Sequence, residues 1–449
     1  MTFELTAKLE KDIRSFIDNN DIASLTELYK EWHFADLAEI LEKLPLEKSV
    51  YLVKIFDANK TSEALMELEE DLRESIFEQL SAKEIAEELD ELDSDDAADV
   101  LNNLPQKRME VVIAEIEDDE HAGKIVELLR YEEGTAGALM AKELVSVNEN
   151  WAVPRCLDNI RTQAINVKRV HSIYVTDNND RLKGRLSLKD LIVAPSEYNI
   201  SQVYISKVDS VLVTDTIEEV ARIMHRYDLE AIPVVDEVNR LLGRITIDDI
   251  FDFVKDEAEK DYQLAAGISS DVEADDTIFE LTKARLPWLI LGLLGGLGSV
   301  YIMKGFETAL EKFPVLFFFT PLIAAMAGNV GVQSSAIIVQ GLANDNVKGS
   351  LFSRLLKEIG LSLINGLVLG VLVIIFGVIV GQETMVSITI SLSMLTVIIL
   401  ASLIGTFVPI ILHKRGIDPA IATGPFITTS NDIFGIFLFF YISKLLLDF

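Results

Sequence analysis

Asp432 is a carboxylate inside an apolar stretch near the C-terminus. The stretch, "ITTSNDIFGIFLFFY" (residues 427–441), otherwise has the composition of a membrane span. A charged side chain at the centre of a bilayer costs about 3 kcal/mol on insertion scales, so such a residue usually faces a polar pathway or a partner. The apolar stretches contain no second acid, and the basic residue within their bounds, Lys444, flanks the end of the last one, about three turns from this acid. A cation is therefore the simplest partner, and a proton relay through the same acid is the alternative.

Two of the apolar stretches also contain amides and helix-breaking residues. They are "TPLIAAMAGNVGVQSS" (320–335) and "DPAIATGPFITTSND" (418–432). Helix breakers at bilayer depth free backbone carbonyls, which are tolerated where they line a cavity. Close helix packing would explain the glycines alone, but not Asn329, Gln333 and Asp432 together. The residues expected to line a pathway are Gly328, Asn329, Gly331, Gln333, Gly424, Pro425 and Thr428.

Five apolar segments are long enough to cross a bilayer, which takes about 20 residues. They lie near residues 286–303, 313–342, 359–381, 384–412 and 421–447. Lys and Arg gather at one set of segment ends, so the positive-inside rule places residues 1–285 and the loops 343–358 and 413–420 in the cytoplasm. An odd number of spans then puts the C-terminus outside. We expect a multi-pass protein of the plasma or inner membrane.

The net charge of −32 lies on the polar part of the chain. Residues 286–449 contain eight Lys or Arg and eight Asp or Glu, so residues 1–285 carry the whole excess of acid. This acidity argues against nucleic acid or anionic lipid as a partner, because both require positive charge. It permits cation binding, although an acidic solvated surface explains it equally well. The single cysteine, Cys156, excludes an internal disulfide framework and fits a reducing cytosol.

Residues 1–130 have the periodicity of an acidic all-α domain. The motif "ADLAEILEKLP" (35–45) recurs as "DDAADVLNNLP" (95–105), with a proline at the end of each copy. Short helices that repeat a motif predict a helical superhelix rather than a compact bundle.

A second, stronger repeat predicts a pair of α/β modules. The segment "HSIYVTDNNDRLKGRLSLKDLI" (171–192) aligns without gaps, at an offset of 59 residues, with "EAIPVVDEVNRLLGRITIDDIF" (230–251). Each copy reads strand, polar turn, strand and helix start. This pattern resembles a tandem pair of CBS domains, a regulatory module that often binds adenosine nucleotides. The resemblance places Asp190 and Asp249 where that family hydrogen-bonds a ribose, so ATP at the pair and a purely structural pair are the alternatives.

The segment "IDDIFDFVKDEAEKDYQLAAG" (247–267) joins the modules to the first span and is rich in acid. Four acidic side chains fall roughly one turn apart on this predicted helix: Asp249, Asp252, Glu257 and Asp261. Like charges at such spacing destabilise a helix by about 0.2–0.5 kcal/mol per pair. Asp95 and Asp99 form a second pair of this kind in the helical domain. A solvated face explains most such runs, but an acidic helix at the mouth of a membrane domain favours a cation site.

The order of these parts resembles the MgtE family of magnesium channels. The motifs most specific to the resemblance are Gly328-Asn329-x-Gly331-x-Gln333 and Gly424-Pro425…Thr428-x-x-x-Asp432. It implies a homodimer with a pore between the membrane domains, Asp432 as the ion-binding residue of that pore, and a connecting "plug" helix from about Asp252 to Ala266. The regulatory magnesium sites that it implies involve Asp95, Asp99, Glu218, Asp228, Asp249, Asp252, Glu257, Asp261 and Asp418.

The sequence therefore predicts a multidomain protein. Its parts are an all-α helical superhelix (1–130), an α/β tandem CBS pair (131–251), a connecting helix (252–275) and a five-helix transmembrane domain (276–449). The expected function is passive import of Mg²⁺, which stops when cytosolic Mg²⁺ bridges the acidic faces. The alternatives are a proton-coupled divalent cation transporter and a CBS membrane sensor without transport. Passive flow is expected because the sequence shows no P-loop for ATP hydrolysis. An enzyme is not expected, because the sequence shows no nucleophile–base constellation.

Overall fold

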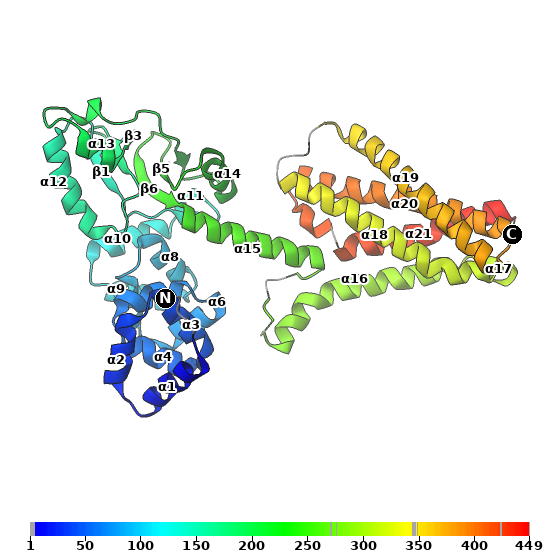
Figure 1. The fold of residues 1–449 in the computed structure, drawn as a ribbon, viewed down its shortest axis with the longest axis horizontal. Coiled ribbons are helices and arrows are strands. Elements are labelled where there is room, and N and C mark those ends of the chain that lie inside the picture. The colour runs from blue at the N-terminus through cyan, green and yellow to red at the C-terminus, as the bar shows by residue number, and fades with distance from the viewer. Residues whose placement is uncertain are drawn as a thin grey trace. The chain divides into compact units, whose positions relative to one another are not determined.

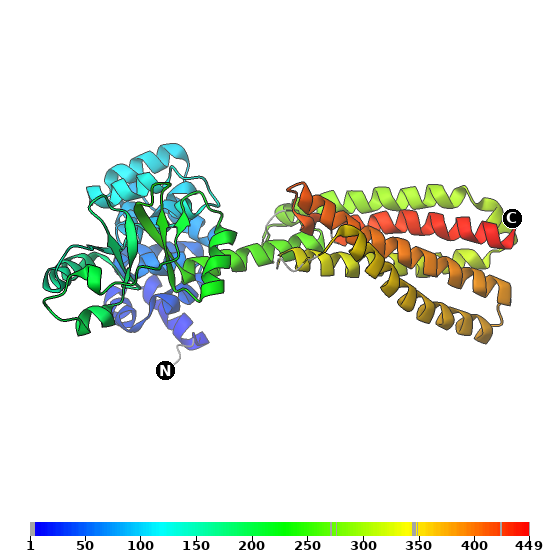
Figure 2. The same cartoon turned by 90° about the horizontal axis from the view of Figure 1, so that it is seen from above.

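The computed structural model describes residues 5–269, 272–274, 276–343, 347, 349–422 and 424–448. The chain divides into two compact units, Met1–Val254 and Lys255–Phe449. Helices fill both units, whereas the described strands all lie in the first (Figures 1 and 2). The first four residues of the predicted helical domain, and part of the predicted loop 343–358, lie outside the described residues.

The first unit begins with ten helices joined by short turns (Figure 1). The sequence repeat falls on equivalent helices, α3 (Phe34–Lys43) and α8 (Ser94–Asn102). The proline of each copy, Pro45 or Pro105, is the N-cap of the next helix. The predicted all-α domain is confirmed. Its other helices are α1 (Ala7–Asp18), α2 (Ile22–Glu31), α4 (Leu46–Ile55), α5 (Ala58–Met66), α6 (Glu70–Gln79), α7 (Ala82–Leu89), α9 (Gln106–Glu115) and α10 (Asp119–Leu128).

Two three-stranded sheets follow, with the same strand order and the same pairing. In each sheet the first strand pairs parallel with the second, which pairs antiparallel with the third. Both sheets shift register at equivalent places, after Val175 and after Val234, which are separated by the offset of the sequence repeat. The predicted CBS pair is confirmed as two copies of one α/β unit. Its elements are α11 (Ala136–Leu139), β1 (Val145–Asn148), α12 (Val153–Gln163), β2 (Ile173–Thr176), β3 (Leu182–Leu186), α13 (Leu188–Val193), β4 (Val211–Leu212), α14 (Ile217–Tyr227), β5 (Ala231–Val235) and β6 (Leu241–Thr246).

The segment that precedes the first α/β unit in the sequence pairs with the second unit. At the start of α11, Ala136 N donates to Asp215 O at 2.8 Å. Ala141 then forms an antiparallel bridge with Arg244 of β6. The helical domain and the second α/β unit also share one hydrophobic cluster, which includes Leu89 and Ile250. The helices and the CBS pair therefore fold as one unit.

The connecting helix α15 runs from Ile247 to Ala266. It follows β6 directly, so it begins before Asp252, where the sequence placed the start of the plug. Asp249 stabilises this start, because its carboxylate accepts hydrogen bonds from Thr246 N at 2.9 Å and Thr246 Oγ1 at 2.6 Å. The connecting helix is thus also the last helix of the second α/β unit.

Among its described residues, the second unit contains five apolar helices long enough to cross a membrane, as predicted. α19 begins earlier than the predicted span, so Glu358, predicted to lie in the preceding loop, continues the same helix as the span. The five are α16 (Ile278–Lys304), α18 (Val315–Ala343), α19 (Leu351–Ile379), α20 (Thr384–Lys414) and α21 (Gly424–Leu447), with α17 (Glu307–Lys312) and η3 (Pro419–Ala422) between them.

The glycines and prolines of the polar segments do not break these helices, contrary to the expectation. α18 continues through Pro321, Gly328 and Gly331, and Gly424 and Pro425 begin α21 instead of interrupting it. Proline is tolerated in the first turn of a helix, because the amide that it lacks has no partner within the helix there. A pathway built by the described residues therefore depends on side chains more than on freed carbonyls.

Candidate functional site

α21 packs against α16 and α18 through small residues. On the α18 side, Asn431 Nδ2 donates to Ala327 O at 3.3 Å, and Asn431 fills the space that a side chain at Gly331 would need. On the α16 side, Thr429 occupies the space beside Gly295 in the same way. Small residues allow this close approach of membrane helices. The glycine of α18 thus positions the helix that carries Asp432.

Asp432 lies on α21 between these two lines of contact. Successive residues are rotated by about 100° around a helix, so Asp432 follows the line of Thr428, four residues earlier. Its side chain is half-buried within one chain. It takes part in none of the ion pairs found among the described residues. This acid is therefore available to a mobile cation, and its role in ion binding stays a prediction.

The polar segment of α18 has two different faces. Gly328 and Gly331 are buried, and the Gly331 carbonyl lies where a side chain at Gly405 of α20 would be. Asn329 and Gln333, one turn apart, are exposed. Amides are unfavourable against lipid, so this face would be covered by a polar pathway or by another subunit. Among the described polar side chains of this segment, these two amides alone are exposed.

The end of α15 meets the start of α21. Gly424 has a φ of +38°, and a Cβ there would overlap Ala265 O. Gly267 has a φ of +81°, and a Cβ there would overlap the ring of Pro425. Such φ values favour glycine, so both sides of this contact require it. One turn along α21, Thr428 Oγ1 donates to the carbonyl of Gly424 at 3.2 Å.

Three predicted regulatory acids lie close together in the second unit. Burial raises the pKa of Asp261, and the charges of Asp418 and Glu257 raise it further. Asp261 and Glu257 lie on α15, and Asp418 precedes η3. A bound cation would relieve this repulsion.

Glu358, which the sequence places in the loop before the third span, has a different environment from Asp432. Ser334 Oγ donates to Glu358 Oε1 at 2.6 Å, so this carboxylate links α18 to α19. One turn along α19, Ser362 Oγ donates to Ser402 Oγ of α20 at 2.6 Å. The hydrogen bonds join three helices, which indicates a packing role. The residue directly precedes the predicted span, so hydropathy gave no signal for it.

In the first unit, α8 and the start of α15 bring together acids from distant parts of the sequence. Burial raises the pKa of Asp96 to about 7, with a further contribution from the charge of Asp249. Burial and the charges of Asp96 and Asp249 raise the pKa of Asp95 well above its usual value. The side chain of Asp99 is exposed to solvent at one side. Its partial loss of hydration and the charge of Asp249 nevertheless raise its pKa to about 6. We call these four residues the acidic cluster; three were predicted, and Asp96 was missed.

The donor set of the acidic cluster fits a divalent cation. Asp95 Oδ1 is buried and has no hydrogen-bond partner in the described structure. Two nearby cations have partners of their own: Arg244 lies 3.4 Å from Asp93, and Lys168 lies 2.8 Å from Glu63. Mg²⁺ prefers oxygen ligands, keeps several waters and is usually held by one or two carboxylates. Within the described ranges, no group of three or more acids, histidines or cysteines is placed to hold a metal ion without rearrangement.

The other predicted site residues are not gathered in one place within the chain. Glu218 and Asp228 lie at opposite ends of α14, about 15 Å apart along the helix. Asp252 is exposed on α15. Asp190 lies in the first turn of α13. Their roles stay predictions.

Gly331→Ala is expected to destabilise the second unit by about 1–3 kcal/mol, because the new methyl group must displace Asn431. Thermal unfolding of the purified protein in detergent would measure the loss. Gly360→Ala is the matched control, since a Cβ at this membrane-helix glycine meets nothing within 4 Å. Equal melting temperatures of the two variants would contradict the packing of Asn431 against α18.

Mg²⁺ binding at the acidic cluster is expected to release protons near pH 7. The raised pKa of Asp96 means that the folded protein holds protons that the unfolded chain has lost between about pH 4 and pH 7. Without Mg²⁺, stability should fall as pH rises through this window. Lowering the pH from 8 to 6 should weaken Mg²⁺ binding about tenfold, because protons compete for the same oxygens.

Calorimetric titration in buffers of different ionisation enthalpy would count the released protons. Asp96→Asn should lower the count, whereas Asp36→Asn, at the equivalent position of the first helical repeat, should not. An unchanged count in Asp96→Asn would show that this carboxyl does not exchange its proton for the ion.

Models of known families match the helical domain, the α/β pair and most of the membrane domain. Residues 320–442 match the MgtE family, described as a divalent cation transporter. Residues 32–134 match the MgtE intracellular N domain, and residues 136–197 and 200–256 match the CBS domain. The magnesium transporter MgtE of Enterococcus faecalis is 37% identical over 327 residues, which are 73% of this chain and 72% of that protein. The corresponding protein of Bacillus subtilis is 36% identical over 71% of each chain.

Solved structures resemble the first unit. The cytosolic domain of the Mg²⁺ channel MgtE, crystallised in complex with ATP, is 33% identical, has a TM-score of 0.51 and matches 55% of this chain and 100% of that one. The soluble part of a magnesium transporter is 30% identical, with the same TM-score, and matches 56% of this chain and 98% of that one. The intracellular N domain, the CBS pair and the apolar helices together describe a multi-pass membrane protein that is a transporter and not an enzyme. The chain belongs to the MgtE family of magnesium transporters.

Proposed function

We propose that this protein imports Mg²⁺ down its electrochemical gradient and that cytosolic Mg²⁺ closes the pathway. The observation that carries the proposal is Asp432, a half-buried carboxylate on a membrane helix that forms none of the ion pairs among the described residues. It lies within the segment that matches the divalent cation transporter family. Inward movement of a divalent cation gains about 4.6 kcal/mol per 100 mV, so passive flow is sufficient.

The pore is proposed to lie between two copies of the chain. The exposed amides Asn329 and Gln333 support this, because they need a polar partner that one chain does not provide. Two Asp432 carboxylates facing one another would suit a largely hydrated Mg²⁺ ion. With the N domain in the cytosol, five spans place the C-terminus outside.

Closure is proposed to begin at the acidic cluster. Without Mg²⁺ the carboxylates of Asp95, Asp96 and Asp249 repel one another, and a bound ion would hold α8 to the start of α15. The other end of α15 contacts Gly424 and Pro425, at the start of the helix that carries Asp432. Such a switch requires only that Mg²⁺ bind the closed state more tightly than the open state. A cation between Asp261 and Asp418 would act in the same direction.

A nucleotide such as ATP is a second proposed ligand of the CBS pair. Support comes from the relative whose cytosolic domain was crystallised with ATP. Asp190 would bind the ribose in the first α/β unit. Asp249 belongs to the acidic cluster as well, so the nucleotide and the cluster would share this carboxylate. One of its oxygens already accepts hydrogen bonds from Thr246.

Uptake of Mg²⁺ into proteoliposomes under an inside-negative potential tests the transport mechanism. We expect uptake that follows the voltage and is unchanged when a protonophore collapses the pH gradient while the potential is clamped. Uptake that ceases with the pH gradient would instead establish the proton-coupled alternative. No uptake by properly inserted protein would favour the sensor.

A further inference from the structure

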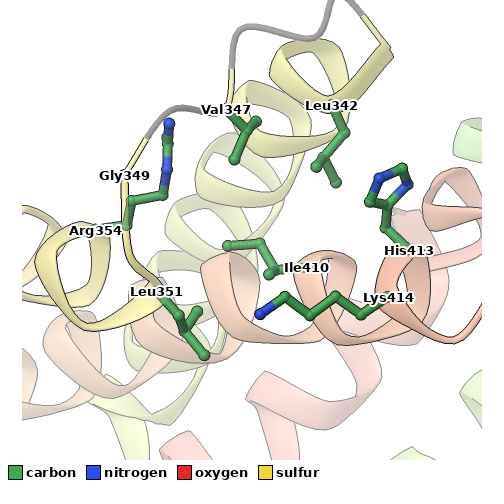
Figure 3. Close-up of a pocket in the computed structure, with 8 residues that line it drawn as sticks. All are labelled: Leu342, Val347, Gly349, Leu351, Arg354, Ile410, His413 and Lys414. Atoms are coloured by element: carbon green, nitrogen blue, oxygen red, sulfur yellow. The ribbon is translucent and has the colours of Figure 1, made fainter.

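A cavity of about 210 Å³ lies among the ends of three membrane helices (Figure 3). Arg354 comes from the first turn of α19, and His413 and Lys414 come from the last turn of α20. The apolar side chains that share the lining with these basic residues are Leu342, Val347, Leu351 and Ile410. The cavity thus combines nitrogen donors with an apolar wall.

The surroundings of this cavity are suited to the edge of a bilayer. Phe352 and Leu356, on the first turns of α19, are exposed and apolar. α19 starts at the cavity, so the positive end of its helix dipole adds to the charge of the basic side chains. A soluble anion would use only the donors, whereas a phospholipid would use the donors and the apolar surface together.

The topology places this cavity on the cytoplasmic side. It lies at the end of α18 and the start of α19, and with the N domain in the cytosol the connection between these two helices is cytoplasmic. Lys357 and Arg415 add further positive charge to the same ends. The cytoplasmic leaflet carries anionic lipids, and basic pockets between membrane helices on this side bind their headgroups.

We propose that this cavity binds the phosphate headgroup of an anionic phospholipid from the cytoplasmic leaflet. The guanidinium of Arg354 and the ammonium of Lys414 hold the phosphate, and the acyl chains follow the exposed apolar face of α19. The acidity of the chain argued against such a partner, but that argument concerns residues 1–285. Residues 286–449 are neutral as a whole and positive at this edge. The headgroup would fasten α19 to α20 next to the loop that precedes α21.

Binding of phosphatidylglycerol to the delipidated, purified protein would test the proposal, with native mass spectrometry and the melting temperature as readouts. Phosphatidylcholine is the neutral reference lipid. The double variant Arg354→Gln/Lys414→Gln should bind phosphatidylglycerol about 30-fold more weakly, since each cation near an anionic lipid surface contributes about fivefold. The control Lys304→Gln/Lys312→Gln, at the other ends of the helices, should bind like the wild type.

Three further outcomes are decisive. Arg354→Lys/Lys414→Arg should retain binding, because it preserves both charges. Equal affinity of the wild type and the Gln double variant would overturn the proposal. If inorganic phosphate alone raised the melting temperature as much as the lipid and displaced it, the cavity would be a site for a soluble anion, and the lipid assignment would be wrong.

Discussion

Asp432→Ala is expected to lower Mg²⁺ uptake into proteoliposomes about 100-fold or more. Two unit charges 4 Å apart attract by about 4 kcal/mol at the effective dielectric constant of a protein surface, and a loss of about 3 kcal/mol already corresponds to a factor of 100. The expected loss of uptake comes from removal of the charge alone, because Asp432 forms none of the ion pairs found in the described parts of the chain. Asp432→Asn should therefore fail as well, although its shape is preserved.

Glu358→Gln is the matched control for this experiment. It also removes a carboxylate from a membrane helix, but glutamine can still accept the hydrogen bond from Ser334. Uptake should stay within about threefold of the wild type, a change of less than 1 kcal/mol. If Asp432→Ala transported as well as Glu358→Gln, the ion would follow another route, and the proposed pore would be wrong.

Joint neutralisation of the acidic cluster is expected to leave the pathway open when cytosolic Mg²⁺ is high. In Asp95→Asn/Asp99→Asn/Asp249→Asn, the Mg²⁺ concentration that halves uptake should rise about tenfold or more. The reason is that Mg²⁺ binds the cluster more tightly in the closed state, so the variant loses an interaction that stabilises closure. Asparagine at position 249 can still accept from Thr246, so the start of α15 should form. Uptake at low Mg²⁺ should be unchanged.

Asp36→Asn/Glu39→Gln serves as the control for the cluster variant. These acids occupy, in the first helical repeat, the positions equivalent to Asp96 and Asp99, but the carboxylate of Asp36 caps its own helix by accepting a hydrogen bond from His33 N. Closure should keep its normal Mg²⁺ dependence in this variant. Normal closure in the cluster variant as well would move the sensor to another site, for which Asp261 and Asp418 are the next candidates.

The sequence by itself determined the class of the protein and the number of its membrane helices. Hydropathy depends on local composition, and the thickness of a bilayer is fixed, so five spans could be counted without knowledge of their packing. The CBS pair was equally accessible, because the same order of strands and turns occurs twice at a constant offset. Asp432 was recognised because a lone acid in an apolar run is costly wherever the helix is placed.

Only the tertiary structure decided how the sites are assembled. The sequence could not pair Asp96 with Asp249, because a carboxylate acquires its burial and its charged neighbours from helices that are distant in sequence. It also could not distinguish a glycine that breaks a helix from one that makes room for a neighbour. Gly331 does the second, since Asn431 occupies the space that its missing side chain leaves. Burial, repulsion and close packing are properties of pairs of elements, and local composition determines none of them.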